Sequence, residues 1–147
     1  MKIVLISCSA KKQKHCSPAK DMYISRLFKG AYKYAKKLNA DKIFILSAKR
    51  KLLEETDWIK PYDESLIKKS KGERQNWAKD IFNSLIEKGV DLQSDKFVFL
   101  AGVKYREFII EYINNEHVKH KANICIPLKG LRIGEQLAFY NKEKCNE

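Results

Sequence analysis

Four short apolar runs divide the chain, and each has the character of a buried strand. Their apolar residues are continuous rather than alternating, which is typical of parallel strands covered on both faces. The runs predict strands over residues 2–7, 42–47, 96–101 and 123–126.

Amphipathic segments lie between and after these runs. Apolar residues recur every three or four positions after Ser25, which is a suitable N-cap, and the pattern ends at Asn39. Ser70 and Glu73 have the spacing of a capping box and predict a second helix that ends at Gly89. A third helix is predicted after residue 102 and a last one through Leu137, Ala138 and Tyr140. Trp77, on the apolar face of the second helix, is predicted to be part of the core.

Alternating strands and helices predict an α/β protein. The expected architecture is a three-layer α/β/α fold with a small, about four-stranded and mostly parallel sheet, in one domain over residues 1–147. Right-handed crossovers place the carboxyl ends of parallel strands at one edge of the sheet, where such folds bind ligands. Residues after these strand ends therefore include the first candidates for a site: Cys8, Ser9, Ser47, Lys49, Gly102 and Gly130.

The connection after the second strand loses regular periodicity for some twenty residues. It carries Lys49, Arg50 and Lys51, followed by Tyr62 and Asp63. A compact domain rarely keeps so long an irregular connection unless it forms part of a site. We therefore expect this connection to contribute to the candidate site.

Composition and charge narrow the possible locations and partners. The net charge of +12 favours a polyanionic partner, although lysines spread over every predicted helix also form an ordinary solvated surface. No apolar stretch approaches the length of a signal peptide or a membrane span, and the four cysteines lack a C-x-x-C pair. These features predict a cytoplasmic protein with free thiols, no membrane partner and no cofactor. Metal binding by Cys8, His15 and Cys16 is disfavoured by their spacing, and His117 and His120 are predicted to be solvated.

A set of motifs runs through nearly the whole chain. They are Cys8-Ser9 with Lys12, Tyr23 with Ser25 and Phe28, Leu46-Ser47-Ala48-Lys49, Pro61-Tyr62-Asp63, Arg74 with Trp77-Ala78, Gly102 with Tyr105, and Pro127-Leu128 through Gly130 to Gly134. In this order they resemble an uncharacterised domain family of bacteria, archaea and phages, the DUF6884 type. The family's His-Gly pair is replaced here by Arg50-Lys51, and a guanidinium cannot act as a base at neutral pH.

The resemblance implies a class of ligand. The family is similar, more distantly, to the peroxide-stress YaaA proteins, which are associated with DNA binding, and to a domain of the archaeosine-synthesis enzymes, which modify a deazaguanine base in tRNA. That wider group is likened to the uracil-DNA-glycosylase fold. A nucleobase, a nucleotide or a nucleic acid is therefore the expected partner, while the oligomeric state is left open.

Two main functions follow from these expectations, and the sequence does not separate the first from a toxin–antitoxin or phage-defence accessory that binds a nucleotide signal. In the first, the protein is an enzyme of base modification or repair, in which Ser9, Lys12, Ser47 and Lys49 hold an anionic group. Tyr23 and Tyr62 would then contact a base, and Asp63 would activate water or orient the base. Asp63 could instead be a loop carboxylate paired with Arg74 or Lys49, and Cys8 is either a nucleophile or a small buried cysteine. Ser25, Arg74, Gly102, Tyr105, Gly130 and Gly134 complete the expected binding residues.

The second function is a non-catalytic, basic stress-response protein that binds DNA or RNA. Such a protein would use its lysine-rich faces on phosphates, so its affinity would fall steeply with salt. It would also tolerate the loss of Asp63.

Overall fold

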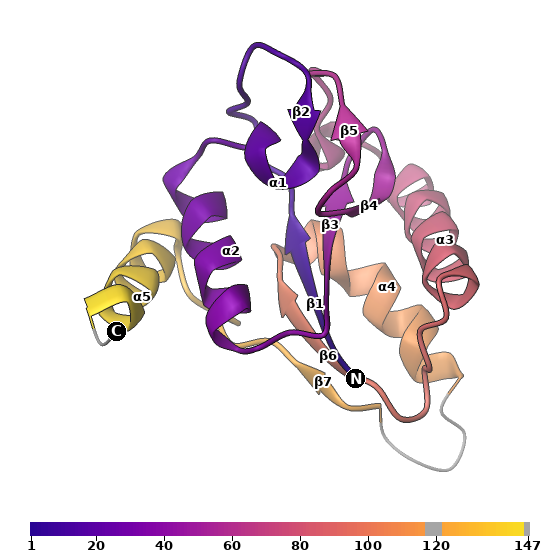
Figure 1. Ribbon diagram of the computed structural model, residues 1–147. Helices are drawn as coiled ribbons and strands as arrows, with labels where there is room; N and C mark the ends of the chain where they lie inside the picture. Colours follow the sequence, from indigo (N-terminus) through magenta and orange to yellow (C-terminus); the bar gives the residue numbers. More distant parts are fainter. Residues whose placement is uncertain (117–121, 146–147) are drawn as a thin grey trace.

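The computed structural model describes residues 1–116 and 122–145 and shows a three-layer α/β domain (Figure 1). A central five-stranded sheet has the order β4-β3-β1-β6-β7. Its strands are β1 (Lys2–Ser7), β3 (Lys42–Ser47), β4 (Lys51–Glu54), β6 (Lys96–Leu100) and β7 (Ile124–Cys125). All neighbours pair in parallel except β3 and β4. The four parallel strands predicted from the apolar runs are thus confirmed.

Strand β1 lies in the middle of the sheet. Its residues pair with β3 on one side, where Ile6 faces Ile45, and with β6 on the other, where Ile6 faces Leu100. Ile3, Val4, Leu5 and Ile6 are almost completely buried. Continuous apolar sequence is required here because helices cover both faces of the strand.

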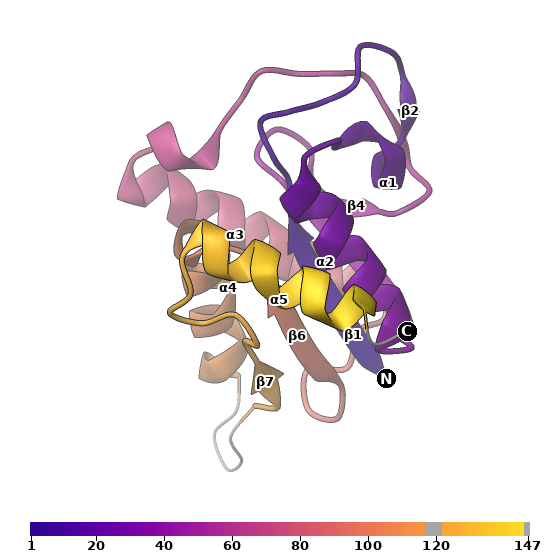
Figure 2. The same ribbon diagram turned by 90° about the vertical axis from the view of Figure 1, so that its left-hand side faces the viewer.

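Two helical layers cover the sheet. On one face lie α2 (Arg26–Lys37) and α5 (Ile133–Cys145), and on the other lie α3 (Lys71–Glu87) and α4 (Val103–Asn115) (Figures 1 and 2). Ser25 caps α2 by accepting a hydrogen bond from the Phe28 N–H. Both bonds of the predicted Ser70–Glu73 capping box are present at the start of α3. Trp77 is buried, which confirms the prediction that it is part of the core.

The expectation of an irregular connection after β3 is wrong. A tight turn leads directly into β4, an antiparallel edge strand, and β5 (Trp58–Ile59) and the short 3-10 helix η1 (Leu66–Lys68) follow. Lys51 has a φ of 63°, a left-handed conformation that reverses the chain. Strand β5 pairs antiparallel with β2 (Ser17–Pro18), which precedes the four-residue helix α1 (Ala19–Met22).

Several simpler expectations concern single residues. Cys8, Cys16 and Cys125 are free thiols, whereas the side chain of Cys145 is outside the described part of the chain. His117 and His120 also lie outside the described residues. Within residues 1–116 and 122–145, no helix is long and apolar enough to cross a membrane.

Helices α2 and α5 approach each other closely at a glycine. A Cβ atom built on Gly30 would lie 2.8 Å from Cδ2 and 2.9 Å from Cβ of Tyr140. The Tyr140 Cβ is fixed to the backbone of α5, so it cannot rotate away. Glycine at position 30 therefore sets the distance between the two helices.

We expect Gly30→Ala to lower the stability of the protein. Forcing the helices apart costs about 1–3 kcal/mol, which outweighs the gain of at most about 1 kcal/mol from replacing glycine by alanine in a helix. The measurement is the urea midpoint, with Gly72→Ala as the matched control, because nothing lies within 4 Å of a Cβ at that helical glycine. Equal effects of the two substitutions would contradict close packing at Gly30.

Candidate functional site

The order of the strands creates a crevice beside the end of β1. From β1 the chain passes through α2 to β3, and from β3 it passes through α3 to β6 on the opposite side of β1. The segments after β1 and β6 therefore leave toward opposite faces of the sheet. Such a switch point is where open α/β sheets usually bind ligands.

A cleft of about 530 Å³ occupies this switch point. Among the residues predicted for the site, seven line it: Cys8, Ser9, Lys12, Ser25, Asp63, Gly102 and Tyr105. Its walls come from the ends of β1 and β6, the starts of α2, α4 and α5, and the segment before η1. The predicted edge of the sheet thus holds a cavity of ligand size.

The start of α4 gives one side of the cleft a positive character. Gly102 is the N-cap of this 13-residue helix and provides no side-chain cap, so the first N–H groups are left without an intrahelical acceptor. Lys104 lies in the first turn, with its Nζ 3.3 Å from the Ile67 carbonyl oxygen. Lys12 extends over the Tyr62 ring, with its Nζ 4.3 Å from the ring centroid. Both lysines line the cleft.

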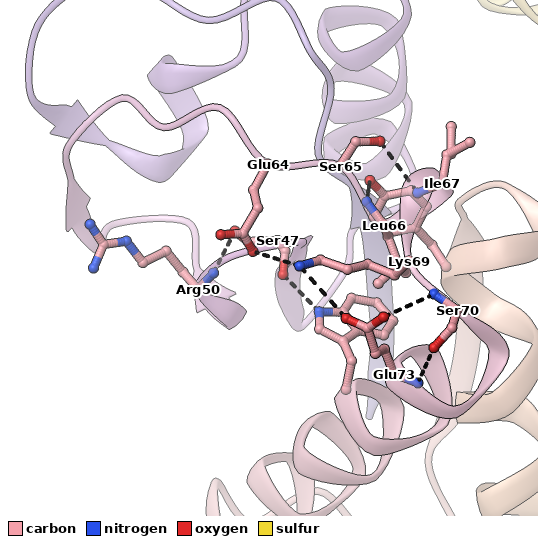
Figure 3. A network of polar contacts seen from close by, with 11 residues as sticks. Ser47, Arg50, Glu64, Ser65, Leu66, Ile67, Lys69, Ser70 and Glu73 are labelled. Carbon is pink, nitrogen blue, oxygen red and sulfur yellow. Dashed lines mark hydrogen bonds and ion pairs between the residues drawn. The ribbon is translucent and has the colours of Figure 1, made fainter.

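Two carboxylates lie on the segment that borders the cleft. The Glu64 carboxylate is 4.0 Å from Lys69 Nζ, and Lys69 also lies 3.9 Å from Glu73, as Figure 3 shows. Asp63 is exposed and lines the cleft, and the ion pairs and hydrogen bonds of the described residues do not include its carboxylate. The alternative pairing of Asp63 with Arg74 or Lys49 is therefore not observed. Its carboxylate is available to a ligand.

Cys8 and Tyr105 contact each other at the base of the cleft. The Cys8 thiol donates to the Tyr105 hydroxyl at 3.6 Å, and the Leu66 N–H donates to the same oxygen at 3.5 Å. Burial, together with Cys8, raises the pKa of Tyr105 above its usual value. Cys8 is 8% exposed and donates to a neutral phenol rather than to a base. This arrangement favours the small buried cysteine over the nucleophile, since a nucleophile must be a thiolate.

Three hydroxyl groups form a cluster next to the cleft. The Tyr62 hydroxyl lies 2.6 Å from that of Tyr23 and 2.7 Å from that of Ser47. Burial raises the pKa of Tyr23 to about 12 and raises that of Tyr62 further. Both phenols therefore remain neutral at physiological pH, where they serve as hydrogen-bond partners rather than as bases.

Ser47 has a structural role in addition to its place in this cluster. Its hydroxyl accepts a hydrogen bond from the Arg50 N–H at 2.9 Å, and its carbonyl accepts one from the Trp77 indole at 2.9 Å. Ser47 is completely buried. In Figure 3 the Arg50 side chain points away from Lys69 and Glu64.

The remaining predicted residues do not line the cleft. Lys49 is exposed on the turn after β3. Arg74 donates to the Lys69 carbonyl oxygen at 2.8 Å and lies 3.5 Å from Glu107, which is its anionic partner within the described chain. Gly130 forms a turn with a φ of 82°, and Gly134 is in the first turn of α5, so the expected glycine cradle is not part of this cavity.

Sequence reasoning missed the apolar rim of the cleft. Ile67, Val103 and Ile133 line it and are 61%, 55% and 66% exposed, respectively. Exposed apolar side chains gathered at a cavity mark a surface that a ligand or partner covers. Val103 had a recognisable signal, because it follows the predicted strand end at Gly102. Ile133 and Tyr140 had none, because their position depends on the packing of α5.

No group of three or more His, Cys, Asp or Glu side chains in the described part of the chain is arranged to hold a metal ion. The polar groups of the cleft are lysine ammonium groups, hydroxyls, carboxylates and backbone N–H groups. This set suits an organic anion with hydrogen-bonding groups.

Comparison with protein families gives a match over residues 3–142 to a family of unknown function, DUF6884. The chain belongs to this family. No curated protein and no solved structure matches it. The resemblance inferred from the motifs is therefore confirmed at the level of the DUF6884 family.

The hydroxyl cluster predicts a loss of stability at high pH. The pKa of Tyr23 is about 12 in the folded protein and 10.0 in an unperturbed tyrosine. The contribution of this raised pKa to the free energy of unfolding is therefore fully present below pH 10. As the pH rises from 10 to about 12, the Tyr23 phenol ionises first in the unfolded chain, so its contribution to the free energy of unfolding is lost. Urea unfolding of the wild type and Tyr23→Phe should show a shallower decline for the variant in this range. Parallel declines would show that Tyr23 does not carry the effect.

Proposed function

We propose that the protein is an enzyme that binds a nucleotide or nucleobase in the switch-point cleft and acts on the base. The proposal is supported above all by one observation: a cleft of about 530 Å³ combines cationic groups, an accessible carboxylate and an apolar rim. The choice of a nucleotide among anionic ligands follows the resemblance to base-modifying enzymes. Free thiols at Cys8, Cys16 and Cys125 favour a reducing, cytoplasmic location.

The start of α4 is the proposed position of the phosphate. Its open N–H groups and the helix dipole favour an anion, and Lys12 and Lys104 add two positive charges. Both ammonium groups now contact backbone carbonyl oxygens, at 3.4 Å for Lys12 and 3.3 Å for Lys104. A phosphate would be the stronger partner for either group.

The apolar rim is the proposed position of the base. Ile67, Val103 and Ile133 offer a surface on which a planar ring loses contact with water. Asp63 would accept hydrogen bonds from ring or amino N–H groups, or would remove a proton from water. Ser9 and Ser25 supply further hydroxyls in the same cavity.

A second candidate function is non-catalytic binding of DNA or RNA in a stress response. The observation that favours it is the net charge of +12. Phosphate contacts spread over the surface would give this function, without any need for a carboxylate.

A thermal-shift series separates the two functions. We expect nucleoside monophosphates to raise the melting temperature more than nucleosides, free bases or inorganic phosphate, at both low and moderate salt. Lys12→Ala and Lys104→Ala should abolish the additional effect of the phosphate. Lys49→Ala is the matched control, since Lys49 is exposed away from the cleft lining. Stabilisation by oligonucleotides alone, fading as salt rises, would support the second function and contradict the first.

Asp63→Asn tests catalysis once a stabilising ligand is known. We expect the dissociation constant to change by less than about threefold, while turnover of the ligand falls by about 10²- to 10⁴-fold, the usual contribution of a general base. Calorimetry measures binding, and chromatography of the reaction mixture measures turnover. Unchanged turnover would remove Asp63 from the mechanism.

A further inference from the structure

A second cavity, of about 500 Å³, lies between α2 and α5 and extends to α1. We call it the α2–α5 groove. Phe28 and Tyr140 line both this groove and the switch-point cleft, so their rings form a wall common to the two cavities. Tyr23, a member of the hydroxyl cluster beside the cleft, lines the groove as well.

Positive charge dominates the lining of the groove. Its charged lining residues are Lys20, Arg26, Lys29, Lys33 and Lys37, together with Asp21. The four cations of α2 recur every three or four residues, so they form a stripe along one face that is about 16 Å long at 1.5 Å per residue.

Most of these cations make no ion pair with the described residues, as is also the case for other exposed lysines such as Lys49 and Lys71. Lys36, beside the stripe on α2, pairs with Glu55 at 3.0 Å, and Lys51 pairs with Asp80 at 2.6 Å. By contrast, Lys20, Arg26, Lys29 and Lys33 are exposed, and the ion pairs of the described residues include none of them. Asp21 is the one acidic side chain among the described lining residues, so positive charge is in excess along the groove.

Aromatic rings accompany the stripe. Tyr32 and Tyr34 are half-buried and line the groove next to the buried Phe28 and Tyr140. The rings of Phe28 and Tyr32 are nearly parallel, with an interplanar angle of 13° and a centroid separation of 6.4 Å. Tyr32 is held in place by its hydroxyl, which donates to Glu55 at 2.6 Å. A row of cations beside fixed aromatic rings is the usual design of surfaces that bind single strands.

We propose that the α2–α5 groove binds single-stranded nucleic acid. Phosphates lie along Arg26, Lys29 and Lys33, and bases contact the aromatic side of the groove. An unpaired strand fits because α5 walls the groove opposite α2, and because only unpaired bases expose their faces to aromatic rings. An acidic peptide would satisfy the charge but not the rings. The inference does not rest on the proposed enzymatic function, because its cationic residues differ from those of the cleft, although Phe28 and Tyr140 line both cavities. It gives the second candidate function a defined place on the molecule.

The test is fluorescence anisotropy with a labelled 12-nucleotide DNA strand that cannot self-pair, at 50 and 200 mM salt. Lys29→Glu/Lys33→Glu should weaken binding by more than about tenfold, with an affinity that depends less on salt. Lys71→Glu/Lys79→Glu is the matched control, because it makes the same change of charge on exposed positions of α3, in the opposite layer. This control should weaken binding by less than about threefold.

A second pair of variants tests the aromatic contact. Tyr32→Phe keeps the ring and loses the hydroxyl, and Tyr32→Leu loses both. We expect only Tyr32→Leu to weaken binding, by about tenfold, while circular dichroism and the melting temperature confirm that each variant is folded.

Four results would overturn the inference. They are no binding by the wild type, equal losses in the two charge variants, tighter binding of the duplex form of the same sequence, and equal binding of a poly-glutamate peptide with the same dependence on Lys29 and Lys33. The cleft variants Lys12→Ala and Lys104→Ala are measured in parallel. Failure in the groove with intact nucleotide binding in the cleft would refute this inference alone.

Discussion

The pairing of β1 on both sides is the constraint on which the rest of the structure depends. Four apolar residues in succession leave this strand no polar face, so its backbone groups need hydrogen bonds from β3 and β6 and its side chains need helices above and below. The two neighbours are reached by connections that leave in opposite directions. The crevice at the end of β1 is therefore a consequence of strand order. Cys8, Ser9 and Gly102 belong to it because they are the first residues after the two strands.

Sequence reasoning succeeded where a local pattern has a single structural solution. Buried runs, caps at Ser25 and Ser70 and the chain reversal at Gly89 led to strands and helices close to those observed. It failed at β4, because a four-residue edge strand with two buried side chains gives almost no periodicity. For the candidate site, the sequence predicted where each strand ends, but it could not predict the direction in which each following loop leads its side chains. Lys49 follows a strand end, as Cys8 does, yet its loop turns back along the sheet and carries the side chain away from the cleft.

Several motif residues stabilise the segments next to the cleft and do not line the cleft themselves. Ser47 joins the turn after β3, the indole of Trp77 on α3 and the phenol of Tyr62 through one hydroxyl and one carbonyl. Arg74 ties the start of α3 to α4 through Glu107. A substitution at either position would disturb the loops that shape the cleft without touching a ligand. Loss of function at such residues is therefore weak evidence for a direct contact, and stability has to be measured beside activity.

The placement of α5 has a consequence for local unfolding. This helix completes a wall of both cavities and meets the rest of the domain chiefly along α2, around the glycine contact with Tyr140. Detachment of α5 would leave the sheet paired but would open both cavities at once. A ligand held in either cavity would oppose that detachment. Amide hydrogen exchange along α5 then becomes a common reporter for two different ligands, including those that never contact its backbone.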